Sequence, residues 1–125
     1  MTENEIATKI LDVAFTLHKT LGPGLLETVY EQTLAYELNE IGIRTVTQVP
    51  VPLVYKEIKF EAGYRLDLLV EDKVIVEIKS TENLAPVHFA QTLTYLRLAD
   101  KKLGLLMNFN SKYLKDGIHR IVKRL

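Results

Sequence analysis

The first forty residues place apolar and polar side chains with the period of an α-helix. From Glu5 to Leu21 an apolar residue recurs every three or four positions, which predicts an amphipathic helix that ends at Gly22-Pro23-Gly24. The same spacing returns from Leu26 to Ile41, and Gly42 stands where a helix is expected to end in a left-handed residue. The chain is therefore predicted to open with two helices.

Beyond these helices the pattern changes to a period of two, which is typical of strands. Alternation over residues 49–55 and 58–70, with a turn at Lys56-Glu57, predicts an antiparallel pair. Pro50 and Pro52 cannot donate ladder hydrogen bonds, so the first strand is expected at an edge of the sheet. The apolar run at 74–79 is typical of a central strand.

The last third of the chain predicts one more helix and two more strands. The helix is expected to start near Pro86 and to end near Ala99, with Phe89, Leu93 and Leu96 as its core stripe. Strands are expected at 103–109 and 117–122. The predicted fold class is α/β (α+β mixed): one domain over residues 1–125, with a central mixed sheet of four to five strands flanked by helices.

Composition limits the chemistry that this domain can perform. The 125 residues are 47% apolar and 26% charged, as a compact soluble core requires. The acidic start and the lack of a long apolar run predict no signal peptide and no membrane partner, so a cytoplasmic location is expected. Cysteine is absent and the three histidines are scattered, so any metal must be held mainly by oxygen.

Charge is balanced over the whole chain but unevenly distributed along it. Residues 1–43 contain two lysines and seven acidic residues, whereas residues 101–125 contain seven lysines or arginines and one aspartate. The basic C-terminal region could face phosphates. A solvated basic tail would explain the same composition.

The candidate catalytic residues are Asp67, Glu77 and Lys79. Glu77 and Lys79 are two apart on a predicted strand and so project from the same face. If residues 71–73 form a three-residue hairpin loop, Asp67 lies opposite Glu77. The same count sets Arg65 opposite Lys79, where Arg65 is a candidate contact with substrate.

Two facing carboxylates repel each other, and one of them is expected to take up a proton unless a cation lies between them. Mg²⁺ prefers oxygen ligands and keeps water, so Asp67, Glu77, the main-chain carbonyl of Ile78 and phosphate oxygens would complete its coordination. Lys79 could then orient the attacking water, accept its proton if the lysine's own pKa is depressed, or neutralise the transition state. The spacing alone fits a second interpretation, in which Lys79 forms exposed salt bridges with both carboxylates.

Several motifs in order point to a family. Asp67 followed by Glu77-Ile78-Lys79 resembles the PD-(D/E)XK nuclease superfamily, and Gly24-Leu25-Leu26-Glu27-Thr28-Val29-Tyr30 resembles the signature of its GxxExxY branch. Residues 64–70, 88–96 and 103–109 are further matches. Leu66 replaces the proline of the superfamily name. The resemblance implies a restriction-endonuclease-like core and a nuclease that uses Mg²⁺, or Mn²⁺ in its place, to hydrolyse phosphodiester bonds of nucleic acid, with DNA favoured over RNA.

The resemblance also assigns supporting roles. Glu27, on the early helix, would be a further catalytic metal ligand, although a surface glutamate favoured by the helix dipole explains it equally well. Gln91 and Tyr95 resemble a Q-x-x-x-Y element and would hold the lysine or a phosphate oxygen. His88 shares their helix face and is a candidate phosphate contact or a histidine of the helix start. Tyr30 is expected to pack, with its hydroxyl hydrogen-bonded.

Three functions stay open on the sequence. The first is a metal-dependent nuclease. The second is a catalytically silent module of the same fold that binds nucleic acid or protein, which the zero net charge would suit. The third is an oligomer, since small nucleases of this architecture often act as homodimers. A chain of this length has little room for base readout, so contacts with the phosphate backbone are expected.

Overall fold

A computed structural model describes residues 1–124 of the chain. Its first two elements are the predicted helices, α1 (Glu3–Leu21) and α2 (Glu27–Glu40). Thr2 caps α1: its hydroxyl accepts the Glu5 N–H at 3.2 Å, and the Glu5 carboxylate accepts the Thr2 N–H at 3.0 Å. Gly42 follows α2 with φ +82°, the left-handed conformation predicted for the residue that ends a helix.

The strands form one five-stranded mixed sheet, which confirms the predicted fold class. Its order is β1-β2-β3-β4-β5, with β3 and β4 parallel and the other neighbours antiparallel. α3 connects β3 to β4, and a 3₁₀ turn, η1, precedes β5. The bounds are β1 Thr45–Tyr55, β2 Ile58–Val70, β3 Val74–Lys79, α3 Pro86–Ala99, β4 Leu103–Asn108, η1 Leu114–Gly117 and β5 Ile118–Val122.

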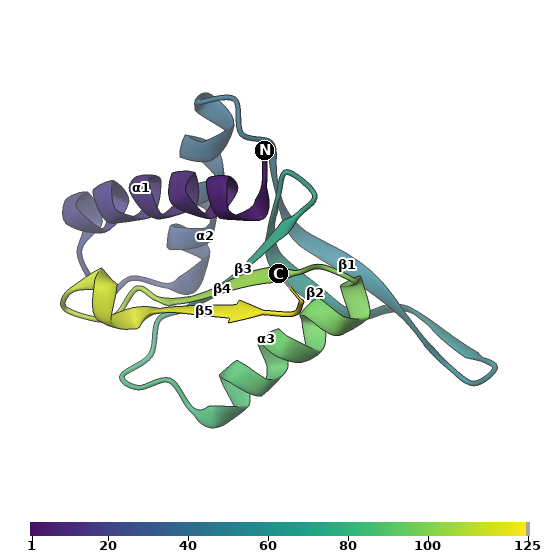
Figure 1. Ribbon diagram of the computed structural model, residues 1–125. Coiled ribbons are helices and arrows are strands. Elements are labelled where there is room, and N and C mark those ends of the chain that lie inside the picture. The colour runs from purple at the N-terminus through teal and green to yellow at the C-terminus, as the bar shows by residue number, and fades with distance from the viewer. Residues whose placement is uncertain (125) are drawn as a thin grey trace.

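The hairpin between β2 and β3 has the predicted three-residue loop. Val70 pairs with Val74, and the ladder continues to the pair of Leu68 and Val76, where it ends. The predicted position of Arg65 opposite Lys79 is therefore wrong. Beyond the last pair β2 leaves β3 and runs on with β1 as a two-stranded ribbon that projects from the body of the molecule (Figure 1). Arg65 pairs with Pro50 of β1.

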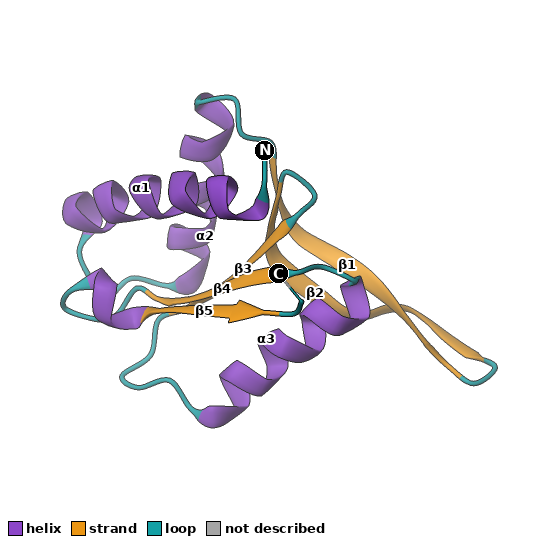
Figure 2. Cartoon of the chain, viewed as in Figure 1, coloured by secondary structure: helices purple, strands orange, loops and turns teal. Residues whose placement is uncertain are grey.

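The first strand lies at an edge of the sheet, as its prolines predicted. It begins at Thr45, four residues earlier than the alternation indicated, and its pairing with β2 shifts register between Val51 and Leu53, on either side of Pro52. Figure 2 shows this ribbon as the longest continuous stretch of strand in the molecule. A projecting edge ribbon interrupted by prolines and a bulge is a poor template for adding another strand.

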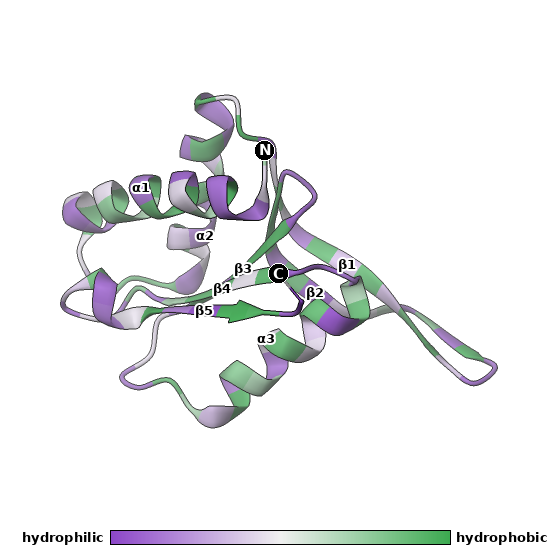
Figure 3. Ribbon diagram, in the orientation of Figure 1, coloured by the Kyte–Doolittle hydropathy of each residue, from purple (hydrophilic) through white to green (hydrophobic). Residues whose placement is uncertain are grey.

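Helices cover both faces of the sheet. α1 and α2 lie on one face and α3 on the other (Figure 1), and the alternation of hydrophobic and hydrophilic residues around α1 is visible in Figure 3. The larger core joins α1 and α2 to the sheet through Leu68, Val76 and Met107, among others, whereas the smaller core consists of Leu66, Leu69, Ile75 and Leu96. Within residues 1–124, no helix combines the length and apolar character needed to cross a membrane.

The core stripe predicted for α3 is only partly correct. Thr92 and Leu96 are buried, whereas Leu93 is 46% exposed. The reason is Gly104 on β4: a Cβ built there would meet the Thr92 Cγ2 at 3.1 Å. The missing side chain lets the helix approach the sheet along Thr92 and Leu96, which turns Leu93 outward.

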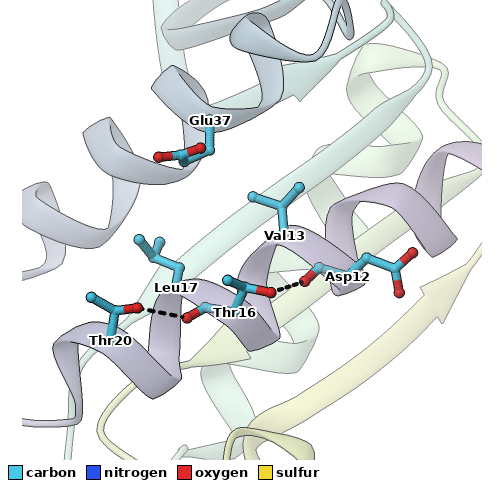
Figure 4. Close-up of a pocket in the computed structure, with 6 residues that line it drawn as sticks. All are labelled: Asp12, Val13, Thr16, Leu17, Thr20 and Glu37. Carbon is cyan, nitrogen blue, oxygen red and sulfur yellow. Dashed lines mark hydrogen bonds between the residues drawn. The ribbon is translucent and has the colours of Figure 1, made fainter.

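A groove of about 350 Å³ between α1 and α2 is lined only by helix residues (Figure 4). The hydroxyls of Thr16 and Thr20 donate to main-chain carbonyls of their own helix at 3.2 Å, so they do not face a ligand. Asp12 and Glu37 supply its only charges, and no strand contributes to the lining. The groove lacks the convergent polar groups expected of an active site.

Candidate active site

Asp67 and Glu77 meet where β2 and β3 part. Asp67 lies at a gap in both ladders: the β2–β3 pairs end at Leu68, and the β1–β2 pairs skip Gln48, whose φ is +50°. The Asp67 N–H donates to Glu77 Oε2 at 3.1 Å, and the Ile78 N–H donates to Asp67 Oδ2 at 2.8 Å. Each carboxyl thus satisfies a main-chain donor near the break in the sheet, and the two predicted residues are brought into contact.

Glu77 is 5% exposed, and this burial, together with the negative charge of Asp67, raises its pKa to about 9. The positive charge of Lys79 offsets part of the effect. The Glu77 carboxyl is therefore protonated at neutral pH unless a cation lies beside it. Exposed salt bridges from Lys79 to the two carboxylates are excluded, because Glu77 is buried and all three ion pairs formed by residues 1–124 lie elsewhere.

Lys79 ends β3 and is half-buried. It is in register with Asn108 of β4, and its main-chain carbonyl accepts the Phe109 N–H at 2.9 Å. The next residue, Ser80, donates its hydroxyl to the Leu25 carbonyl in the loop between α1 and α2 at 2.7 Å. These main-chain contacts hold the base of the Lys79 side chain at the end of a central strand, next to Glu77.

Two polar residues that sequence reasoning did not assign lie beside Asp67. Glu31 on α2 is 5% exposed, and Gln48 on β1 donates its Nε2–H to Glu31 Oε1 at 2.5 Å and to Asp67 Oδ1 at 3.5 Å. Burial and the charge of Asp67 raise the pKa of Glu31. The sequence held a signal for Glu31, which is one helical turn after Glu27, but none for Gln48, which comes from another element.

A small pocket of about 70 Å³ opens in front of this cluster and is lined by Glu27, Thr28, Glu31, Gln48, Asp67 and Ile78. In the described part of the chain, no three acidic or histidine side chains converge into a preformed metal centre. Mg²⁺ needs fewer protein ligands than that, since one or two carboxylates with retained water and substrate phosphates complete its coordination. The oxygen donors of Asp67, Glu77 and Ile78 fit such a hard divalent cation.

Comparison with known proteins decides the family. The family model of the PD-(D/E)XK nuclease superfamily matches residues 4–121. The chain belongs to the PD-(D/E)XK nuclease superfamily. Neither a curated protein nor a solved structure matches it. The predicted resemblance is confirmed at the level of the superfamily, whose members generally use divalent metals, while the GxxExxY branch stays a prediction.

Among the supporting residues predicted for this PD-(D/E)XK domain, Tyr95 lies near the carboxylates. Its ring stacks on Tyr64 of β2 with centroids 4.5 Å apart, and its pKa is raised by burial and then by the negative charges of Glu77 and Asp67. Gln91, one turn earlier on α3, is exposed and forms no hydrogen bond with the rest of the described chain. The structure therefore brings Tyr95 to the site and leaves Gln91 facing solvent.

The remaining predicted residues have other positions or tasks. His88 accepts the Ala85 N–H on its Nδ1 at 3.0 Å and so caps the start of α3, while a phosphate contact by His88 stays a prediction. Glu27 is exposed at the first position of α2, on the rim of the pocket. Tyr30 is fully buried and stacks on Phe109 with centroids 4.6 Å apart, which confirms the packing role expected for it.

Proposed function

We propose that this PD-(D/E)XK protein is a divalent-metal-dependent nuclease of the GxxExxY branch that hydrolyses phosphodiester bonds, in DNA rather than RNA. The observation that carries the proposal is the contact between Asp67 and Glu77 at the break in the sheet, with Lys79 two residues after Glu77 on β3. A buried carboxyl beside a second carboxylate costs stability, and a chain retains such a pair where the pair has a task.

Asp67, Glu77 and the Ile78 carbonyl would hold Mg²⁺, or Mn²⁺ in its place, with Glu27 on the rim as a further ligand. When bound, the ion lowers the pKa of a water molecule and stabilises the negative charge that develops on the phosphate. A cation at this position also favours the charged form of Glu77, which burial otherwise suppresses. The burial of the Glu77 carboxyl beside the half-buried Asp67 supports this assignment.

The other side chains orient groups and balance charge. The Gln48 side-chain amide donates to both the Asp67 and the Glu31 carboxylates and so holds Asp67 in place. Lys79 carries a positive charge next to Glu77, where it can donate a hydrogen bond that orients the attacking water or neutralise the charge of a phosphate oxygen. The Tyr95 hydroxyl can donate a hydrogen bond to the same phosphate. Arg65 and Gln91, both exposed, are candidate contacts with more distant parts of the substrate.

Cleavage of labelled DNA by the purified protein, with Mg²⁺, Mn²⁺ or EDTA, tests the proposal. Asp67→Asn and Glu77→Gln should each lower the rate by at least about 100-fold, because each removes a charged ligand without changing side-chain size. Asp72→Asn is a matched control: Asp72 is an exposed residue of the same hairpin, with 70% of its side chain accessible. The proposal fails if both site variants cleave as fast as the wild type, since the activity then belongs to a contaminant.

A further inference from the structure

Another hollow, of about 470 Å³, lies beside the loop that joins α1 to α2. Its walls are α1 on one side and the segment after β4 on the other. We propose that this groove binds a single-stranded segment of nucleic acid. The segment would belong to the same strand that occupies the small pocket of about 70 Å³ in front of Asp67, here called the carboxylate pocket. The inference rests on the proposed nuclease function and adds that the substrate is single-stranded. The carboxylate site by itself does not distinguish a single strand from a duplex.

The charge of the groove is complementary to a phosphate backbone. Lys19, Lys112 and Lys115 line it, and its lining, all of it within the described residues, contains no acidic side chain. None of the three lysines takes part in the ion pairs formed by residues 1–124. Such a cluster of unneutralised lysines attracts an extended polyanion and releases counterions when it binds one.

This groove also accounts for part of the basic C-terminal region noted in the sequence. Lys101 forms an ion pair with Asp72 at 3.3 Å, and Lys123 forms one with Asp100 at 3.0 Å, so an aspartate neutralises each of these two lysines. Lys112 and Lys115 instead line the groove, and Lys19 joins them from α1. The basic surface is therefore assembled from two distant parts of the chain.

Exposed aromatic rings distinguish a single strand from a duplex. Tyr113 is 58% exposed and Phe15 is 38% exposed, and both line the groove. The Lys112 ammonium lies 5.4 Å from the centre of the Tyr113 ring, so charge and aromatic surface are adjacent. Aromatic rings beside lysines form the usual platform for unpaired bases, whereas a duplex hides the faces of its bases in the stack.

The loop between α1 and α2 leads from the groove to the carboxylate pocket. Gly22 and Pro23 of this loop line the groove, and Leu25 and Leu26, just beyond Gly24, line another hollow together with Ser80, Glu27 and Thr28. Glu27 and Thr28 also line the carboxylate pocket. Residues 22–28, the loop and the first residues of α2, therefore contribute to the lining of all three hollows.

The loop between these hollows is held in place from both sides. The Tyr30 hydroxyl donates to the Gly22 carbonyl at 2.6 Å and accepts the Leu25 N–H at 3.1 Å, and Ser80 donates to the Leu25 carbonyl. His18, which is 8% exposed, donates its Nε2–H to the Phe109 carbonyl at 3.1 Å and so ties the two walls of the groove together. The loop is therefore already ordered before nucleic acid binds, which lowers the entropic cost of binding.

Fluorescence anisotropy with labelled oligothymidylate, in EDTA so that no cleavage occurs, tests the groove. Tyr113→Ala should weaken binding by about 5- to 150-fold, the value of stacking one base, while Tyr113→Phe should bind as the wild type does. Replacing Lys112 and Lys115 by glutamine should lower the slope of log affinity against log salt by about 1.4. The matched control replaces Lys56 and Lys59, two exposed lysines of the β1–β2 ribbon, and should change neither value.

Two results would overturn the inference. One is wild-type affinity in both Tyr113→Ala and the double lysine variant; the other is an equal loss for the single strand and for a duplex of the same length. Because binding is measured without turnover, the two proposals fail separately. A protein that binds through the groove and never cleaves refutes the nuclease function alone, and one that cleaves without using the groove refutes the groove alone.

Discussion

Replacing Glu77 by glutamine should make the metal-free protein more stable at alkaline pH. Glu77 is buried, its folded-state pKa is about 9, and an unfolded glutamate has a pKa of about 4.5. Glutamine has the same size and keeps an oxygen that can accept the Asp67 N–H, but it cannot ionise. The substitution therefore removes the cost of the buried carboxylate while it retains the packing.

The sign follows from the direction of the pKa shift. The folded wild type holds the Glu77 proton more tightly than the unfolded chain does, so this residue's contribution to stability is complete below pH 4.5 and is lost as pH rises toward 9. Within that window each pH unit is worth about 1.4 kcal/mol. From pH 6 to pH 8 the wild type should lose about 2 to 3 kcal/mol relative to Glu77→Gln.

Urea denaturation of both proteins in EDTA at pH 6, 7 and 8 measures this difference, because every other titrating group is common to the pair. Glu61→Gln, on an exposed glutamate of the ribbon, is the control and should follow the wild type at each pH. Adding Mg²⁺ at pH 8 should reduce the difference in unfolding free energy between the two proteins, because the ion stabilises the wild type alone. Parallel stability curves for wild type and Glu77→Gln between pH 6 and pH 8 would refute the reasoning.

Two further substitutions test the packing that holds the site. Tyr30→Phe removes the hydroxyl that bonds Gly22 and Leu25, and should cost about 1 to 2 kcal/mol in urea denaturation; an unchanged midpoint would show that the loop does not depend on it. Gly104→Ala places a Cβ at 3.1 Å from Thr92 Cγ2 and should cost about 1 to 3 kcal/mol. Thr92→Ser removes that methyl group and should recover part of the loss, so additive effects in the double-mutant cycle would contradict the proposed contact.

Much of the architecture is determined by local sequence patterns. The helical period of residues 5–21 persists in the fold because it depends on which face of one element is buried. Residues 58–70 form the predicted strand, although Ile58 and Phe60 at its start are exposed. The prolines of β1 predict an edge strand because a missing N–H excludes a central one. The loop at residues 71–73 sets the hairpin register, and with it the approach of Asp67 to Glu77, because a one-residue slip would turn the strand over.

The rest of the site is decided by tertiary structure. Glu31 and Gln48 reach Asp67 from two other elements, and no local period relates their positions to that of Asp67. Arg65 is not opposite Lys79, because β2 stops pairing with β3 and follows β1 instead, a divergence that hairpin counting cannot anticipate. Burial has the same origin: the sequence indicates that Glu77 shares a face with Lys79, but only the packed helices and strands exclude water from its carboxyl and so raise its pKa.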